Sequence, residues 1–312
     1  MGSKVHKSED GKIAFLFLLA PIIMLIVGYF IYPYPPGDVA LALTQIPMFL
    51  GLILLGAGAL TKKIETGSKI KISGWLIFAF YWSTQPATLY LGEEGDVFNA
   101  SVCVIGVFVL SYLAYHEWLS IKRAEKISCL NWIAGATALA GLIYFGIERT
   151  VLAPWLIEVT ARQSGDVLNL IIGNVSVYGR SIWYNGSYVV TIIFACTAIQ
   201  AMVVFVGMIA ALQKVAIKRK IYGLLVTVVP IYFLNLLRNA LVTFLVANNI
   251  ADFNVAHNYI AKIGALIAMI ILLLILVKII PEILDEIFCL TDLYKRNGPI
   301  EKVIKKMFWR KK

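Results

Sequence analysis

The residues best suited to chemistry are a cysteine, an arginine and a histidine in three apolar stretches of the C-terminal half. Cys196 opens the run ACTAIQAMVVFVG, Arg238 interrupts VVPIYFLNLLRNALVTFLVANN, and His257 stands at the start of the next run. A thiol with an ordinary pKa of about 8.5 becomes a nucleophile when a base takes its proton or a cation stabilises the thiolate. These residue types are typical of nucleophilic catalysis, in which Arg238 could also donate to an oxyanion.

Three amide side chains accompany the thiol and the guanidinium. Gln200 follows Cys196 by four residues, so a continuous helix would place both on one face. Asn235 and Asn239 flank Arg238 and form a polar stripe with it. A charged side chain within the hydrocarbon costs at least about 2.5 kcal/mol, so such residues normally face a bundle interior or a wet cavity. We interpret the amides as supporting residues of a site.

The composition decides what kind of protein carries these residues. The 312-residue chain is 60% hydrophobic and only 15% charged, with a mean hydropathy of +0.82. These values exclude a soluble globular domain and predict an all-α polytopic membrane protein. Runs long enough to cross about 30 Å of hydrocarbon recur and predict a bundle of about eight transmembrane helices. They cover about 13–32, 39–60, 72–91, 97–115, 130–148, 189–213, 221–247 and 256–280.

The basic residues predict the orientation of this bundle. Most of the 28 Lys and Arg residues fall in every second connection and in the C-terminal tail, whereas the other connections hold only Arg149, Arg162 and Arg180. The positive-inside rule then places both termini in the cytoplasm of a multi-pass cell-membrane protein. Cys196 and Arg238 come out at similar depths near the extracytoplasmic face. The net charge of +10 is dispersed over these connections, so we read it as an insertion signal and predict no nucleic-acid partner.

We expect one transmembrane domain over 1–280, with a catalytic core over about 165–280, and a basic amphipathic cytoplasmic tail over 281–312. The long outer segment 149–188 contains Gly179 and Asn185-Gly186 between β-branched and aromatic residues, which predicts one or two hairpins over the site. An ordinary extracytoplasmic loop is the alternative.

Four further residues near the outer face are candidates for contact with a substrate. Tyr178 and Arg180 belong to the predicted hairpin, and Asn258 and Lys262 follow His257 at the mouth of the last span. Lys262 could instead extend outward to the headgroups.

The four cysteines predict neither a disulfide nor a metal site. Cys129 and Cys289 fall at or beyond the inner boundary, and Cys103 and Cys196 fall within spans. No Cys-x-x-Cys or His-Glu-x-x-His spacing occurs. We therefore expect no disulfide, no metal and no cofactor.

Three segments in order, ACTAIQAMVVFVG, NLLRNALVTF and AHNYIAKIGAL, resemble the exosortase/archaeosortase family, in particular the archaeosortases. The resemblance is strongest over about 165–280. It implies an archaeal source and a membrane-embedded cysteine transpeptidase. The implied substrates are exported proteins, such as surface-layer glycoproteins, with a C-terminal sorting signal made of a Pro-Gly-Phe motif, a membrane span and a basic end. A membrane lipid is the implied acceptor of the new C-terminus.

The same resemblance assigns roles to residues of this chain. It implies that Cys196 is the nucleophile, Arg238 the family arginine and His257 the third member, a position held by His or Arg. One departure is Ala198, because the family pattern has Gly after Cys-Thr.

Two other functions fit the membrane character. In a transporter or channel, Arg238, Lys262, Asn235 and Asn239 would line a polar path, but a path needs polar groups in both membrane halves. Here they gather near one face, which favours a one-sided site. A non-catalytic receptor for surface proteins is the other alternative. The sequence gives no indication of an oligomeric state.

Overall fold

The structure is a computed structural model that describes residues 2–92 and 95–308, with side chains described for 11–92 and 95–306. The chain forms two compact units. Unit 1 comprises residues 1–138 and 285–312, and unit 2 comprises residues 139–284. The boundaries fall inside two helices, which therefore belong to both units.

Unit 1 is helical throughout the part of it that the structure describes. Its elements are α1 (Gly2–Ile31), α2 (Asp38–Leu60), α3 (Ile64–Ser83), α4 (Pro86–Leu91), α5 (Val97–Arg123), the first half of α6 (Ser128–Glu148), the end of α11 (Glu282–Thr291), a 3₁₀ turn (Asp292–Arg296) and α12 (Pro299–Phe308).

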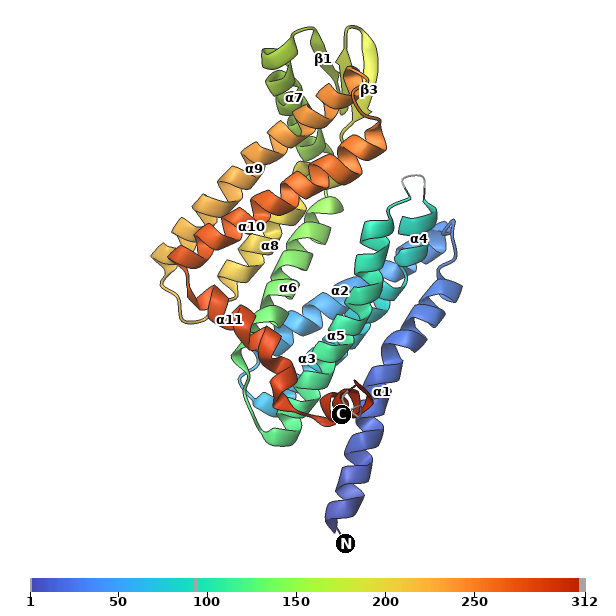
Figure 1. Cartoon of the computed structure of the whole chain (residues 1–312), viewed down its shortest axis with the longest axis vertical. Coiled ribbons are helices and arrows are strands. Elements are labelled where there is room, and N and C mark those ends of the chain that lie inside the picture. Colours follow the sequence, from blue (N-terminus) through green and yellow to red (C-terminus); the bar gives the residue numbers. More distant parts are fainter. Residues whose placement is uncertain (1, 93–94, 309–312) are drawn as a thin grey trace. The chain divides into compact units, whose positions relative to one another are not determined.

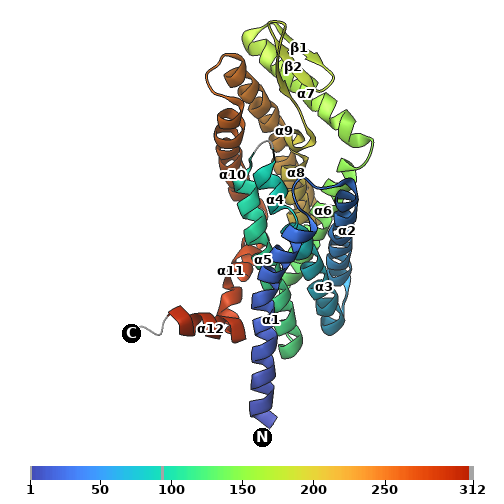
Figure 2. The same cartoon turned by 90° about the vertical axis from the view of Figure 1, so that its right-hand side faces the viewer.

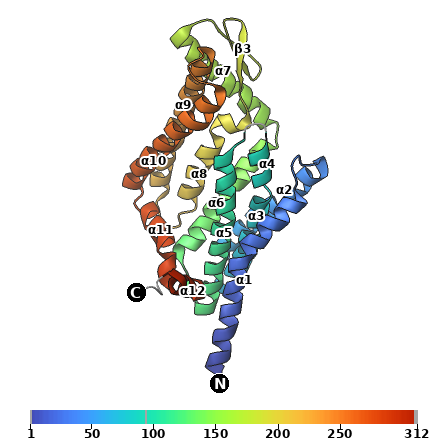
Figure 3. The ribbon, with the colours of Figure 1, turned by 45° about the vertical axis from the view of Figure 1, so that its right-hand side comes forward.

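Unit 2 combines helices with a small sheet. Its elements are the second half of α6, α7 (Leu152–Ile172), β1 (Val175–Tyr178), β2 (Ser181–Tyr184), β3 (Ser187–Thr191), a 3₁₀ turn (Phe194–Thr197), α8 (Ile199–Ala210), α9 (Ile217–Ala247), a π turn (Val255–Ala261), α10 (Lys262–Ile279) and the first residues of α11. The antiparallel sheet has the order β1-β2-β3. Figures 1 and 3 show it beside α7, at the end of the unit where α9 ends and α10 begins.

One or two hairpins were predicted, and the structure has two, formed by β1 with β2 and by β2 with β3. Gly179, Asn185 and Gly186 have positive φ angles of 58°, 50° and 78°, which the tight turns between the strands require. The helix α7, which precedes β1, was not foreseen in the outer segment.

The protein is a polytopic membrane protein with six helices in the described residues that are long and apolar enough to span a bilayer: Gly11–Ile31, Asp38–Leu60, Val97–Arg123, Ser128–Glu148, Ile217–Ala247 and Val255–Ile279. Two of the eight expected spans are not continuous apolar helices. The stretch 72–91 is divided between α3 and α4, and 189–213 is divided among β3, a 3₁₀ turn and the 12-residue α8.

α3 has a polar first half and packs against both α2 and α5. Glycines let α2 and α3 approach closely, since a Cβ on Gly74 would lie 2.9 Å from the Leu55 nitrogen. Lys71 of α3 pairs with Glu117 of α5 at 2.7 Å, and both side chains are almost fully buried. Ser68 also donates to Glu117, at 2.7 Å. These pairs compensate the burial of charge, and they explain why hydropathy alone places the span too late in the sequence.

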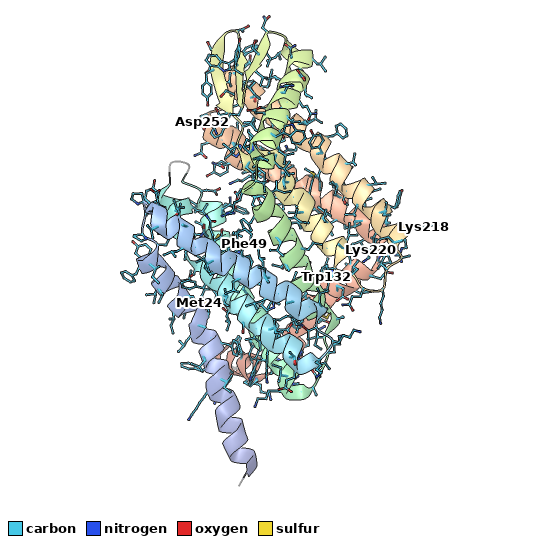
Figure 4. All side chains as sticks on the ribbon, turned by 180° about the vertical axis from the view of Figure 1, so that it is seen from behind. Met24, Phe49, Trp132, Lys218, Lys220 and Asp252 are labelled. Carbon is cyan, nitrogen blue, oxygen red and sulfur yellow. A yellow bond between two sulfur atoms is a disulfide. The ribbon has the colours of Figure 1, made fainter. Side chains whose placement is uncertain are left out.

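The two ends of α9 differ in charge. Figure 4 labels Lys218 and Lys220 at one end of unit 2 and Asp252, just past α9, at the other. This distribution, with basic residues at one end and an acidic residue past the other, is expected of a helix whose basic end faces the cytoplasm. The N-in and C-in topology itself stays a prediction.

One expectation about the cysteines is wrong. Cys129, at the start of α6, and Cys289, on α11, form a disulfide across a sequence separation of 160. Both residues were expected on the same inner side, but nothing in the sequence indicates that α11 folds back against the first turn of α6. Cys103 and Cys196 are not in disulfides.

The C-terminal helix α12 is fastened to α5 through one carboxylate. Tyr112 and Tyr115 donate to the two oxygens of Glu301 at 2.9 and 3.0 Å, and the Ile300 amide donates to the Tyr115 hydroxyl at 3.2 Å. Figure 2 shows α12 lying crosswise to α1, which it also contacts. Burial disfavours the Glu301 carboxylate, but hydrogen bonds with His116, Tyr112 and Tyr115 lower its pKa to about 2.

Glu301→Ala is expected to release α12. A buried hydroxyl that loses its acceptor costs about 1–3 kcal/mol, which corresponds to roughly tenfold or more faster trypsin cleavage after Lys302, Lys305 and Lys306. Asp292→Ala is the control, because its ion pair with Lys295 is exposed and should contribute little. The pKa of Glu301 lies below the ordinary 4.5, so its contribution should be complete above pH 4.5 and lost as the pH falls toward 2. Equal digestion of both variants would contradict this role.

Candidate active site

Cys196 lies in a short 3₁₀ turn, not within a membrane helix. The turn, Phe194–Thr197, connects the end of β3 to α8, and the Cys196 side chain is 7% exposed. The Thr197 hydroxyl donates to the Phe194 carbonyl at 2.7 Å and accepts from the Ile199 amide at 3.4 Å, which holds the turn together. The expectation that Cys196 sits seven residues inside a helical span is therefore wrong.

The break between the 3₁₀ turn and α8 also changes the position of Gln200 relative to Cys196. The expected face with Cys196 requires unbroken helix between the two residues, but α8 begins only at Ile199. Gln200 lies in the first turn of α8 and is exposed. It is not brought to Cys196 by helical spacing.

The two asparagines of α9 converge on the backbone of Cys196. The side-chain amides of Asn235 and Asn239 both donate to the Cys196 carbonyl, at 2.8 and 3.0 Å. Both side chains are buried, and Asn239 Nδ2 also lies 3.4 Å from the buried Ser164 hydroxyl of α7. This carbonyl clamp fixes the Cys196 turn to α9, because a buried carbonyl with two donors resists displacement, and Ser164 ties Asn239 of the clamp to α7.

Arg238 contacts the thiol itself. Its guanidinium is within hydrogen-bonding reach of the Cys196 side chain, and its Nη1 donates to the side-chain oxygen Oδ1 of Asn239 at 3.5 Å. The arginine is half-buried on α9. A cation at this place stabilises a thiolate, and it can also donate to negative charge that develops on a substrate oxygen.

The start of α8 adds to the same electrostatic effect. Ala198 is the N-cap of this helix and has no side chain that can cap it, and the Thr197 hydroxyl accepts only from the Ile199 amide, at 3.4 Å. The partial positive charge at a helix N-terminus favours an anion, so α8 and Arg238 both favour the thiolate of the cysteine that directly precedes the helix.

The sheet shields the cysteine on its apolar side. Cys196 belongs to one buried cluster with Ala161 of α7 and with Ile182, Val190 and Ile192 of the sheet region. The predicted cover over the site is thus formed by β2, β3 and α7. Tyr178 and Arg180, by contrast, are exposed near the first turn, where Tyr178 stands edge-on to Trp183. Their contact with a substrate stays a prediction.

His257 lies in the π turn between α9 and α10, an irregularity that often marks functional positions. Its ring stacks on Phe253, with centroids 5.1 Å apart, and the turn packs on α9. Asn258 donates to Asn254 at 2.7 Å, and its own Oδ1 is buried with no hydrogen-bond partner among the described residues. Lys262 begins α10 and is half-buried. The pairing of His257 with Cys196 stays a prediction.

Two residues of α7 were missed. Ser164 supports the carbonyl clamp, and Gln163 accepts a short hydrogen bond from Tyr232 of α9. Tyr232 could have been found, because it lies one turn before Asn235 on the stripe that continues to Asn239. Ser164 carried no signal, since nothing marks a helix in its segment as a neighbour of α9.

The backbone conformation of Ala198 explains why the family pattern has glycine at this position. Its φ angle is +62° and its ψ angle 3°, the left-handed region that favours glycine. Ala198→Gly should therefore relieve about 1 kcal/mol of strain and raise the melting temperature while activity is kept. Ala198→Val should lower stability by about 2 kcal/mol, because a β-branched residue fits this region poorly. Thermal unfolding in detergent measures both, and the opposite order of stabilities would contradict the assigned conformation.

Comparison with known proteins places the chain in a family. The model of the transmembrane exosortase family (Exosortase_EpsH) matches residues 73–277. The chain is also similar to archaeosortase A of Haloferax volcanii, with 25% identity over 213 residues that cover 62% of this chain and 68% of the relative. No solved structure matches the chain significantly. Because the family match covers more than half of the chain and includes Cys196, the clamp and Arg238, the protein belongs to the exosortase/archaeosortase family of membrane proteins.

Proposed function

We propose that the protein is a cysteine transpeptidase that cleaves a C-terminal sorting signal from exported proteins and transfers the new C-terminus to an amine-bearing membrane lipid. Family membership suggests the cysteine transpeptidase class and sorting-signal substrates. The observation that carries the proposal is the contact of the Arg238 guanidinium with the Cys196 thiol, in a turn whose carbonyl is held by Asn235 and Asn239.

The first half-reaction forms a thioester. The Cys196 thiolate attacks the scissile carbonyl, and Arg238 donates to the oxyanion of the tetrahedral intermediate. The carbon–nitrogen bond then breaks, and the amine of the released segment leaves with a proton. In this scheme His257 removes the thiol proton and returns it to that amine.

The second half-reaction resolves the thioester. The amine of a lipid headgroup attacks the acyl carbon, the carbon–sulfur bond breaks, and the thiol is regenerated. The clamp keeps the Cys196 backbone in place through both steps, so that the sulfur meets successive nucleophiles in one position. Surface-layer glycoproteins with a Pro-Gly-Phe motif, a membrane span and a basic end are the substrates we propose.

An exported reporter with such a C-terminal signal tests the scheme. Reporter and enzyme are placed together in vesicles, with and without hydroxylamine, which attacks thioesters. We expect a shortened reporter with a C-terminal hydroxamate, and an acyl adduct on Cys196 by mass spectrometry. Cys103→Ala is the matched control, since this second free thiol lies on α5 of unit 1. A shortened reporter that never gains hydroxylamine, with no adduct on Cys196, would exclude the thioester.

A further inference from the structure

Three potential metal ligands meet in unit 1, in residues that the proposed reaction does not use. Cys129 is fully buried in the first turn of α6, and Glu286 and Cys289 lie one turn apart on α11. The two sulfurs and a carboxylate oxygen all lie within 4.8 Å of one another. Among the described residues this is the single such group of three or more. Residues three apart share one face of a helix, so α11 presents both of its ligands to Cys129 together.

The carboxylate supplies a second observation. Oε2 of Glu286 is buried and has no hydrogen-bond partner among the described residues, although the carboxyl group also contacts the Ser128 hydroxyl. A buried carboxylate oxygen without a partner is unfavourable, and native structures normally satisfy it with a donor or a cation. The disulfide between Cys129 and Cys289 leaves this oxygen unsatisfied. A cation held between the sulfurs and the carboxylate would satisfy it.

The predicted cytoplasmic location of the site determines whether the two cysteines are oxidised or reduced. The lysine-rich connections place the start of α6 and the C-terminal segment on the cytoplasmic side. There, low-molecular-weight thiols keep most cysteines reduced. Two such thiols deliver two electrons, the Cys129–Cys289 bond opens to two thiols, and the reductant leaves as its own disulfide. Binding of a divalent metal then displaces the two thiol protons.

We propose that the reduced cluster of Cys129, Glu286 and Cys289 binds Zn²⁺. Two thiolates and one carboxylate are ligands that Zn²⁺ accepts, and water can complete a four-coordinate shell. The soft sulfur pair disfavours Mg²⁺ and Ca²⁺, which prefer oxygen ligands. The metal would join α11 to α6 in the reducing compartment, as the disulfide joins them under oxidising conditions. This inference does not depend on the proposed function.

Metal binding to the reduced, full-length protein in detergent tests the site. The protein is treated with a phosphine reductant in metal-free buffer and titrated with Co²⁺, and then with Zn²⁺ in competition. We expect an intense sulfur-to-cobalt charge-transfer band that saturates at one equivalent and disappears when Zn²⁺ displaces Co²⁺. Cys129→Ser and Cys289→Ser should each abolish the band, while Cys103→Ser keeps it.

Glu286→Gln keeps the test informative if the serine variants do not fold. It should weaken Zn²⁺ binding by at least about tenfold, because even residues outside the ligand shell contribute that much. Asp285→Asn is the matched control, since it makes the same carboxylate-to-amide change on the residue directly before Glu286 in α11. Absence of the band in the reduced wild type, or equal Zn²⁺ affinity of the two variants, would overturn the proposal and leave a disulfide only.

Discussion

Replacing Cys196 with alanine is expected to slow the release of a client's C-terminal segment by about 10⁴-fold or more, to the background rate. The variant lacks the only atom in the proposed scheme that can form the acyl intermediate, and loss of a nucleophile costs at least this much in comparable enzymes. Cys196→Ser should lose nearly as much, because a hydroxyl is not ionised by a neighbouring guanidinium. The measurement is the ratio of full-length to shortened reporter over time in vesicles, by mass spectrometry.

The outcome is informative only if the turn survives the substitution. Cys196 contributes a small side chain to the cluster with Ile182, Val190 and Ile192, so alanine fits with little cost in packing. Equal melting temperatures of wild type and variant would show that the fold persists. Cleavage by Cys196→Ala at a tenth of the wild-type rate or more would contradict a covalent mechanism at this residue.

Arg238→Gln is expected to reduce the rate of cleavage by about 10²–10³-fold, the usual effect of losing one donor to a developing oxyanion. Glutamine keeps a donor but removes the positive charge. Arg238→Lys should fall between, because an ammonium keeps the charge without the planar fork that can reach the thiol and Asn239 together.

Alkylation of Cys196 separates the two roles of the arginine. If Arg238 stabilises the thiolate, the midpoint of the alkylation rate moves to higher pH in Arg238→Gln, because less of the thiol is ionised at a given pH. Arg162→Gln is the matched control, since Arg162 is exposed on α7 of the same unit. Wild-type cleavage and an unchanged alkylation profile in Arg238→Gln would contradict both roles.

The sequence predicts those parts of the site whose position follows from the free-energy cost of exposing a polar side chain to lipid. Asn235, Arg238 and Asn239 form a polar stripe on an apolar helix, and the structure places all three beside Cys196. Their convergence could be expected because such side chains must face the bundle interior. What each amide binds could not be predicted, since the acceptor is a backbone carbonyl.

The strand and the 3₁₀ turn around Cys196 could not be predicted from the hydropathy of the sequence. Hydropathy measures compatibility with lipid, and a strand such as Ser187–Thr191 followed by an apolar turn is as hydrophobic as a helix. The positive φ of Ala198, which ends the turn, would have been suggested by glycine but is hidden by alanine. The contact of α11 with α6 was also out of reach, because 160 residues separate the two cysteines.

The short length of α8, the helix after Cys196, has a consequence for the surrounding lipid. At 1.5 Å per residue the 12 residues of α8 extend for about 18 Å, well short of a hydrocarbon thickness of about 30 Å. If α8 ends at the cytoplasmic boundary, as the predicted topology has it, the polar backbone of the preceding turn comes to lie at the depth of the acyl chains and must be screened by protein or by a locally thinned bilayer. Turnover should accordingly depend on acyl-chain length, with thicker membranes burying the sulfur too deeply for a headgroup amine to approach.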